Sequence, residues 1–309
     1  MKILVTGGAG FIGSHLADAY IDQGHQVIII DNLSTGVKDN LHPKAKFYEL
    51  DIRSSAAQDV VKKEQPEIIN HHAAQIRVDI AANDPILDAN VNIIGFLNLL
   101  QAAKDTQSIK KVILASTGGA MYGPKPTPFV ETMLPQPLSP YGISKHADEL
   151  YLYFFRQQYG IDYTALRYAN VYGPRQNPYG EAGVISIFCD KLLAGQQPVI
   201  NGDGTQTRDY VYIADVVKAN LLATEKIAVG EYNIGTGIET DVNQIYDLVC
   251  QALGKDVQAI HGPPRPGEQP TSRLNFDLAK EKLCWEPTVS LTNGIALTVA
   301  FFKQKFIQL

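Results

Sequence analysis

The sequence is poor in the residues that build disulfide frameworks and metal centres. Its 309 residues include three cysteines, Cys189, Cys250 and Cys284, which are widely separated and form no CxxC pair. This spacing excludes a disulfide framework and a thiolate metal site, so we expect a reducing compartment and predict no metal. His71 and His72 are adjacent, but no third ligand stands at useful spacing, and packing or cofactor contact is the simpler interpretation.

Basic charge and long apolar runs are also scarce. The chain carries 27 Lys and Arg against 32 Asp and Glu, and the basic residues are scattered along it. No basic stripe that would bind a nucleic acid is therefore predicted. The apolar stretch before the first glycines is too short for a signal peptide, and no later stretch approaches about 18 uncharged apolar residues. We expect a cytoplasmic protein that binds neither nucleic acid nor membrane.

Short β-rich runs alternate with helical segments in the first part of the chain. This alternation is typical of a parallel sheet wrapped by helices. After Gly173, proline and glycine become frequent and the alternation loosens. We predict an α/β fold with a Rossmann-like doubly wound parallel sheet in residues 1–172. A smaller, mixed α/β substrate domain is expected in residues 173–309, interleaved with the first. The predicted strands lie at 2–7, 26–31, 46–51, 67–74, 111–116 and 163–173.

The first predicted strand runs directly into the glycine-rich stretch TGGAGFIGSH, in which Gly7, Gly10 and Gly13 satisfy GxxGxxG. Glycines let the backbone turn tightly and approach a pyrophosphate at the N-terminus of the helix that begins near Phe11. The second strand ends in Asp31, where a carboxylate accepts a hydrogen bond from a ribose 2′-OH and repels a 2′-phosphate. The pattern predicts NAD rather than NADP; the alternative is a glycine-rich turn beside a surface aspartate.

Tyr141 and Lys145 stand four residues apart in SPYGISKHADEL, at the start of a helical segment. This spacing places both side chains on one helix face, about one turn apart. A tyrosine with a pKa of about 10 needs nearby positive charge to act as a base near neutral pH, and Lys145 can supply it. The alternative is an exposed pair of helical side chains without a catalytic role. The presence of the nucleotide motif favours the catalytic interpretation.

Several stretches together resemble the extended short-chain dehydrogenase/reductases, and within them the UDP-glucose 4-epimerases. They span nearly the whole chain and read TGGAGFIG, DNLS, HHAAQ, YGISK, LRYANVYGPRQ, GDGTQTRDYVYIADV and RPGE. The resemblance implies bound NAD, a UDP-sugar substrate and a homodimer that packs through helical faces in 86–103 and 143–159. Burial within one subunit explains part of the same apolar pattern.

The resemblance also implies roles for single residues. Tyr141 would be the base, and Lys145 would hold the nicotinamide ribose and lower the tyrosine pKa. Asp51 and Ile52 would flank the adenine, and Asn92 would lie near the active-site tyrosine. The implied cofactor residues are Gly7, Gly10, Phe11, Ile12, Gly13, Asp31, Asn32, Asp51, Ile52, Ala73 at the pyrophosphate, Asn92, Tyr141, Lys145 and Tyr168 beside the nicotinamide.

The stretch ILASTGGAMYG, residues 113–123, contains no carboxylate. Similar enzymes that eliminate water carry an Asp-Glu pair after the hydroxyl, and decarboxylating ones commonly carry a Glu, because those reactions need an acid or a further base. A phenolate, a hydroxyl and a hydride acceptor suffice to oxidise a sugar alcohol and reduce it again. This composition favours inversion at C4 of UDP-glucose or UDP-galactose through a transient 4-keto sugar, with NAD bound throughout.

The catalytic hydroxyl departs from the pattern of the family. Four residues before Tyr122, where many relatives have Ser or Thr, the chain has Gly118. Thr117 and Ser116 precede it, and we predict that Thr117 supplies the hydroxyl.

Substrate contacts are also implied by the resemblance. Arg208 and Arg265 would clamp the substrate diphosphate, although ion pairs with Asp209 and Glu268 are the alternative for each. Ser272 stands where glucose-restricted relatives carry tyrosine, so we hypothesise that UDP-GlcNAc is turned over as well. The remaining implied substrate residues are Asn170 at the diphosphate, and Val184, Val199 and Asn201 at the uridine.

Two other functions remain open from the sequence. One is another NAD-dependent nucleotide-sugar enzyme on the same scaffold, such as a UDP-glucuronate 4-epimerase, a decarboxylase or a 4,6-dehydratase. The other is a catalytically silent NAD-binding regulator, which the presence of Tyr141 and Lys145 disfavours.

Overall fold

A seven-stranded parallel sheet forms the centre of the computed structural model, which describes residues 1–179, 183–226, 228–264 and 269–307. The strand order reverses at β1, which pairs with β2 on one side and with β4 on the other. Ligands of such sheets bind in the crevice beyond the carboxyl ends of the strands at this reversal. The predicted Rossmann-like doubly wound fold is confirmed. In spatial order the strands are β3 (Lys46–Glu49), β2 (Gln26–Asp31), β1 (Lys2–Thr6), β4 (Ile68–His71), β5 (Lys111–Thr117), β6 (Asp162–Tyr168) and β10 (Gly230–Ile234).

Helices cover both faces of this sheet because alternate strand residues point to opposite sides. In β1, Ile3 and Val5 belong to the apolar cluster that includes helices α1 (Phe11–Asp22) and α8 (Ile213–Glu225). Leu4 belongs to the opposite cluster, with α2 (Ser55–Glu64), α5 (Gly95–Lys104) and α6 (Pro140–Tyr159). Strands buried on both faces need continuous apolar runs, as in QVIIID.

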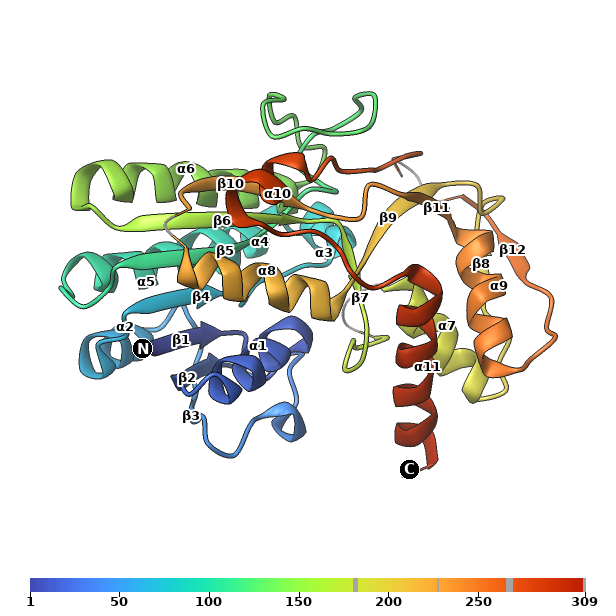
Figure 1. Cartoon of the computed structure of the whole chain (residues 1–309), viewed down its shortest axis with the longest axis horizontal. Helices are drawn as coiled ribbons and strands as arrows, with labels where there is room; N and C mark the ends of the chain where they lie inside the picture. Colours follow the sequence, from blue (N-terminus) through green and yellow to red (C-terminus); the bar gives the residue numbers. More distant parts are fainter. Residues whose placement is uncertain (180–182, 227, 265–268, 308–309) are drawn as a thin grey trace.

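A smaller group of elements lies beyond the large sheet, at the right of Figure 1. A three-stranded sheet contains antiparallel and parallel pairs, and a two-stranded parallel sheet stands beside it. This mixed architecture agrees with the smaller α/β part expected from the sequence. The elements are β7 (Asn170–Tyr172), β8 (Val199–Asn201), β9 (Thr207–Tyr212), β11 (Glu239–Asp241), β12 (Ile260–Gly262), α7 (Val184–Leu193), α9 (Val242–Leu253) and α11 (Leu291–Ile307). Helix α10 (Asp277–Leu283) packs instead against β10 and α8, over the large sheet (Figure 1).

The prediction of one strand over residues 163–173 is wrong. β6 ends at Tyr168 in the large sheet, and β7 begins at Asn170 in the three-stranded sheet. Ala169 lies between them, and its amide donates to the Ile234 carbonyl at 2.9 Å. Because aromatic and β-branched residues continue from β6 into β7, the sequence pattern runs across this change of sheet without a visible break.

The chain returns to the large sheet after passing through the smaller group. β10 pairs in parallel with β6, with Gly230 opposite Thr164, and α8 packs against the same sheet. The sequence analysis did not identify this edge strand. The division near residue 172 stays a prediction, and the smaller group is not formed by one continuous segment.

One helical run could cross a membrane by length and composition alone. It is Pro85–Lys104, among the described residues, and 44% of its most apolar window is buried within the fold. It combines α4 (Pro85–Ala89), the π-helical turn η2 (Asn90–Ile94) and α5, whose side chains pack with α2 in the core. A core helix passes the same test. The remaining short elements are η1 (Lys38–Asn40) and α3 (Val78–Asn83).

Candidate active site

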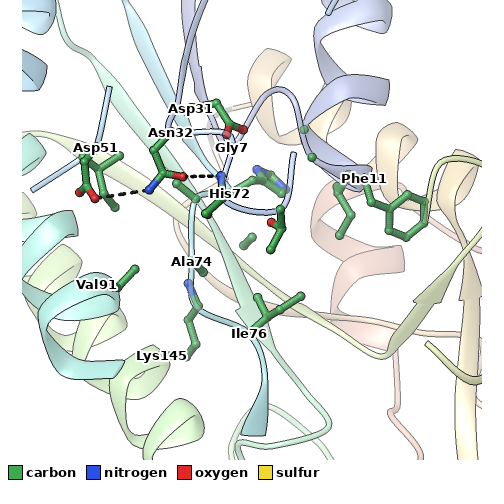
Figure 2. Close-up of a pocket in the computed structure, with 18 of the residues that line it drawn as sticks. Gly7, Phe11, Asp31, Asn32, Asp51, His72, Ala74, Ile76, Val91 and Lys145 are labelled. Carbon is green, nitrogen blue, oxygen red and sulfur yellow. Dashed lines mark hydrogen bonds between the residues drawn. The ribbon is translucent and has the colours of Figure 1, made fainter. Parts of the chain in front are cut away.

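A cavity opens at the carboxyl ends of the central strands, where the strand order reverses (Figure 2). It contains nearly all of the residues predicted to contact the cofactor. Asn92 is the exception. The predicted residues that line the cavity are Gly7, Gly10, Phe11, Ile12, Gly13, Asp31, Asn32, Asp51, Ile52, Ala73, Tyr141, Lys145 and Tyr168.

The glycine turn after β1 leaves no room for side chains. Gly7 has φ +70°, and a Cβ there would lie 2.8 Å from the Ala73 nitrogen. A Cβ on Gly13 would lie 2.2 Å from the Gly7 carbonyl oxygen. The turn and the first turn of α1 therefore pack backbone against backbone. This leaves a cradle of amide groups at a helix N-terminus, which fits a pyrophosphate.

Carboxylates occupy the far end of the cavity. Asp31 accepts hydrogen bonds from the Ala9 amide at 3.0 Å and the Leu33 amide at 2.8 Å, while its burial raises its pKa. Asn32 donates to Asp51 (Figure 2). Among the described residues that line the cavity, Lys145 is the one lysine or arginine, and it does not lie at this end. A 2′-phosphate would meet negative charge here, which favours NAD.

Tyr141 and Lys145 lie in the first turns of α6. The helix begins where Ser139 accepts a hydrogen bond from the Gly142 amide at 3.2 Å, followed by Pro140 at the first position. Burial raises the pKa of Tyr141, and the negative charges of Asp88 and Asp148 raise it further. Lys145 is 1% exposed, and burial lowers its pKa. The tyrosine therefore depends on positive charge at the site to ionise.

The two neighbouring hydroxyls at the end of β5 have different surroundings. Ser116 lines the cavity, but its hydroxyl donates to Glu149 at 2.6 Å. Arg167 holds the same carboxylate through Nε at 2.9 Å and Nη2 at 2.7 Å. The Thr117 oxygen accepts from the Ala120 amide at 3.2 Å, and its proton has no acceptor among the described residues. Thr117 itself is not part of the cavity lining, so its catalytic role stays a prediction.

Asn92 acts at one remove from the cavity. Its side chain is buried in the π-helical turn, donates to the Gln75 carbonyl at 2.9 Å and accepts from the Gln75 amide at 2.8 Å. It also donates to the buried Asp88 at 3.0 Å. These contacts hold the segment after β4, where Ala74 and Ile76 line the cavity.

The predicted substrate residues come from separate elements beyond β5 and β6. A Cβ on Gly119 would lie 3.8 Å from Asn170 Oδ1 and 3.9 Å from Ser272 Oγ, so these three residues converge. Arg208 lies in β9 and donates to the Thr207 carbonyl at 2.7 Å. The other predicted positions are Val184 at the start of α7, Val199 and Asn201 in β8, and Arg265, which lies outside the described residues.

A buried carboxylate ties this side together. Asp209 accepts hydrogen bonds from the Thr236 amide at 2.8 Å, the Gly237 amide at 3.0 Å and the Leu274 amide at 3.2 Å. Leu274 in turn lies over Gly118, where a Cβ would be 2.5 Å from its Cδ1. From the sequence, Asp209 was weighed solely as an ion-pair partner. Its place next to Arg208 in a predicted substrate-binding stretch was the signal that could have indicated its role.

Further cavity residues, most of which lie at or after the ends of strands of the large sheet, were given no role from the sequence, although Ser34 and His72 lie in the stretches DNLS and HHAAQ. They could have been found from the rule that side chains after parallel strands meet at one edge. His71 packs instead, with its ring 4.5 Å from that of Phe96 and Nδ1 2.8 Å from Thr6 Oγ1. Within the described ranges no group of three His, Cys, Asp or Glu side chains could hold a metal ion. The unpredicted lining residues include Ser34, Thr35, Leu50, His72, Val91 and Ala115.

Comparisons with known proteins agree with this geometry. The model of the NAD dependent epimerase/dehydratase family matches residues 3–235. A curated relative, the putative UDP-glucose 4-epimerase of Methanocaldococcus jannaschii, is 47% identical over 97% of this chain and 98% of its own. The UDP-glucose 4-epimerase of Thermotoga maritima, solved with UDP-glucose, is 50% identical with a TM-score of 0.95 over 99% of both chains. The Thermus thermophilus enzyme, solved with NAD, is 41% identical with a TM-score of 0.94 over 98% of this chain and 99% of its own.

Proposed function

Since the chain belongs to the NAD dependent epimerase/dehydratase family, we propose that it interconverts UDP-glucose and UDP-galactose by inverting C4 of the sugar. Tyr141 and Lys145 at the edge of the dinucleotide cavity are the observation that carries this proposal. NAD, held by the glycine turn and Asp31, would supply a reversible hydride acceptor for the sugar. No external oxidant is then consumed.

Tyr141 removes the proton from the sugar 4-hydroxyl and later returns a proton to the 4-keto oxygen, while inversion comes from reduction of C4 on the opposite face of the sugar. Burial and the charges of Asp88 and Asp148 raise the tyrosine pKa. The role we propose for Lys145 is to offset these effects with its positive charge. We propose that the Thr117 hydroxyl, whose proton has no acceptor among the described residues, donates to the reacting oxygen. Gly118 and Gly119 leave no acid for elimination of water. The arrangement therefore suits reversible oxidation better than dehydration.

The substrate must be held by its nucleotide while the sugar rotates. Arg208 and Asn170 provide charge and an amide for the diphosphate, and Val199 and Asn201 approach the uridine. Ser272 and Gly119 lie close together, since a Cβ on Gly119 would be 3.9 Å from Ser272 Oγ, and in our proposal these two small residues border the sugar. We infer that an N-acetyl group at C2 fits there and that UDP-GlcNAc is a second substrate.

Two exposed apolar faces support a homodimer, which we propose to act in the cytoplasm. Ile143, Leu150 and Phe154 lie on one face of α6 and are 55%, 58% and 45% exposed. Ile86 and Ile94, in the α4–η2 run, are 73% and 52% exposed. Patches of this kind mark interaction surfaces. Light scattering should give twice the mass of the chain, and a monomeric mass that persists at high concentration would contradict the dimer.

The experiment that tests the activity omits free NAD. Purified protein is incubated with UDP-galactose, and UDP-glucose is followed by chromatography. We expect turnover without added cofactor, and a roughly 10²–10⁴-fold lower kcat for Tyr141→Phe, the range typical of a lost general base. Absence of UDP-glucose formation by protein that retains NAD would reject the proposal. Turnover of UDP-glucuronate alone would instead identify a different enzyme of the family.

A further inference from the structure

Lys145 lies against a buried carboxylate that sequence analysis did not identify. Asp148, three residues further along α6, is fully buried, and its Oδ2 lies 3.7 Å from Lys145 Nζ. Neither Lys145 Nζ nor either Asp148 oxygen has a hydrogen-bond partner among the described residues. The two side chains are thus paired by charge rather than by a hydrogen bond.

The other charged groups nearby are already engaged. Glu149 is held by Arg167 and Ser116 on the β5–β6 side of α6. Asp88, in α4, accepts from Ser144 at 2.6 Å and from the amides of Gln75 and Asn92. At the end of β4, burial lowers the pKa of both His71 and His72, and both rings are neutral near pH 7.

Asp148 and Lys145 each need the charge of the other. Burial raises the pKa of Asp148 and lowers the pKa of Lys145, while the opposite charge of the partner acts against both shifts. A buried ion that loses its partner is strongly destabilised or becomes neutral. Without Asp148, the ammonium on which Tyr141 depends would be harder to maintain.

We propose that Asp148 is a positioning residue for the reaction, whose carboxylate keeps the Lys145 ammonium charged and in place beside Tyr141. Asp148 does not line the cavity, so it acts through Lys145 and not on the substrate. The inference rests on the proposed function, because it assigns Asp148 to the same catalytic pair.

The pH profile of Asp148→Asn tests this role. Removing a negative charge lowers the pKa of every acid nearby, so both the tyrosine limb and the lysine limb of kcat/KM should move to lower pH by about one unit or more. Asp148→Glu keeps the charge and should retain limbs closer to those of the unsubstituted enzyme. Unchanged limbs in an active Asp148→Asn enzyme would overturn the inference while leaving the proposed function intact. Inactivity of the unsubstituted enzyme would defeat the function itself.

Asp215 offers a matched control. It is 1% exposed and accepts hydrogen bonds from Thr288 and Val289, outside the cavity lining. Asp215→Asn removes an equally buried carboxylate and should leave both limbs in place, and a shift as large as that of Asp148→Asn would mean that the effect is not specific.

A second comparison covers a failure of Asp148→Asn to fold. Asp148→Leu alone strands the Lys145 charge, whereas Lys145→Met with Asp148→Leu removes both charges and should restore thermal stability. A double variant no more stable than Asp148→Leu would show that the two side chains do not act as a charge pair.

Discussion

The cofactor side and the substrate side of the site are positioned by different means. On the cofactor side, Gly7 follows β1, Asp31 ends β2 and Ala73 follows β4, so one parallel sheet places them all. On the substrate side, Gly119 and Asn170 approach Ser272 from distant parts of the chain. A sheet register is visible in a sequence, whereas the convergence of loops is not.

The glycine turn and Asp209, which lie at the centre of the two sides, are also stabilised differently. The glycine turn is fixed by backbone packing, as the short separation between Gly13 and Gly7 requires. The loops of the substrate side depend on the side chain of Asp209, which accepts hydrogen bonds from the amides of Thr236, Gly237 and Leu274. Substitutions should therefore affect the two sides in different ways.

The largest effect is expected at Glu149 in α6, whose carboxylate accepts hydrogen bonds from Ser116 in β5 and Arg167 in β6. Burial alone would raise the pKa of Glu149, but the hydrogen bonds and positive charge of Arg167 and the hydrogen bond from Ser116 oppose it, and the pKa is lowered. Glu149→Gln should cost about 3–5 kcal/mol at pH 7, the usual result of breaking a buried pair. Urea unfolding monitored by circular dichroism measures it.

The pH dependence of this contribution has a defined sign. Because the folded pKa of Glu149 lies below its ordinary value of 4.5, the stabilisation is complete above that value and is lost as the pH falls through the folded pKa. The stability difference between the unsubstituted protein and Glu149→Gln should shrink in strongly acidic solution. A difference that grows on acidification would contradict this linkage.

The glycine turn is the next most sensitive point and isolates the cofactor side. The side chain in Gly13→Val would collide with the Gly7 carbonyl. We expect this overpacking to weaken the binding free energy of NAD by about 3 kcal/mol, or roughly 100-fold in affinity. Calorimetric titration with NAD measures it. Gly24→Ala is the control for loss of stability without a collision at the cradle, because Gly24 has φ +81° and nothing lies within 4 Å of its added Cβ; it should lower stability and leave NAD affinity unchanged. Normal NAD affinity of Gly13→Val would show that the glycine turn does not hold the dinucleotide.

Thr117 and Ser116, at the end of β5, lie between the cofactor side and the substrate side, and their substitutions should separate a catalytic role from a structural one. Thr117→Val should lower kcat about 100-fold through loss of a donor to the reacting oxygen, with stability nearly unchanged. Ser116→Ala should instead cost about 1–3 kcal/mol of stability, because it leaves Glu149 short of a hydrogen bond. Steady-state kinetics and thermal unfolding of both variants separate the roles. A lower kcat for Ser116→Ala alone would transfer the catalytic role to Ser116.

The smallest effect concerns selectivity on the substrate side. Ser272→Tyr should reduce kcat/KM for UDP-GlcNAc by about tenfold or more, while UDP-galactose turnover changes little. Parallel assays with the two substrates give the ratio. Equal loss with both sugars would mean that the side chain disturbs the diphosphate grip, and no turnover of UDP-GlcNAc by the unsubstituted enzyme would refute the hypothesis on substrate width.

The extent of successful prediction follows from this difference in construction. The cavity contains the glycine turn, Asp31 and the Tyr141–Lys145 pair as predicted, because each is set by local spacing within one element or turn. The break at Ala169 was missed because it depends on which sheet offers hydrogen bonds to the backbone. Asp148 was missed because a carboxylate on a helix is usually exposed, and its burial depends on packing across α4 and β4.

The pairing of β10 with β6 has a consequence for how the protein is made. Until residues 230–234 have emerged from the ribosome, β6 presents an open edge to any other strand. A nascent chain that already contains the dinucleotide cavity thus exposes the unpaired edge of β6 through much of its synthesis. A fragment that stops near residue 172 should aggregate, and adding the remaining part of the chain, which contains β10, should pair this edge and suppress aggregation.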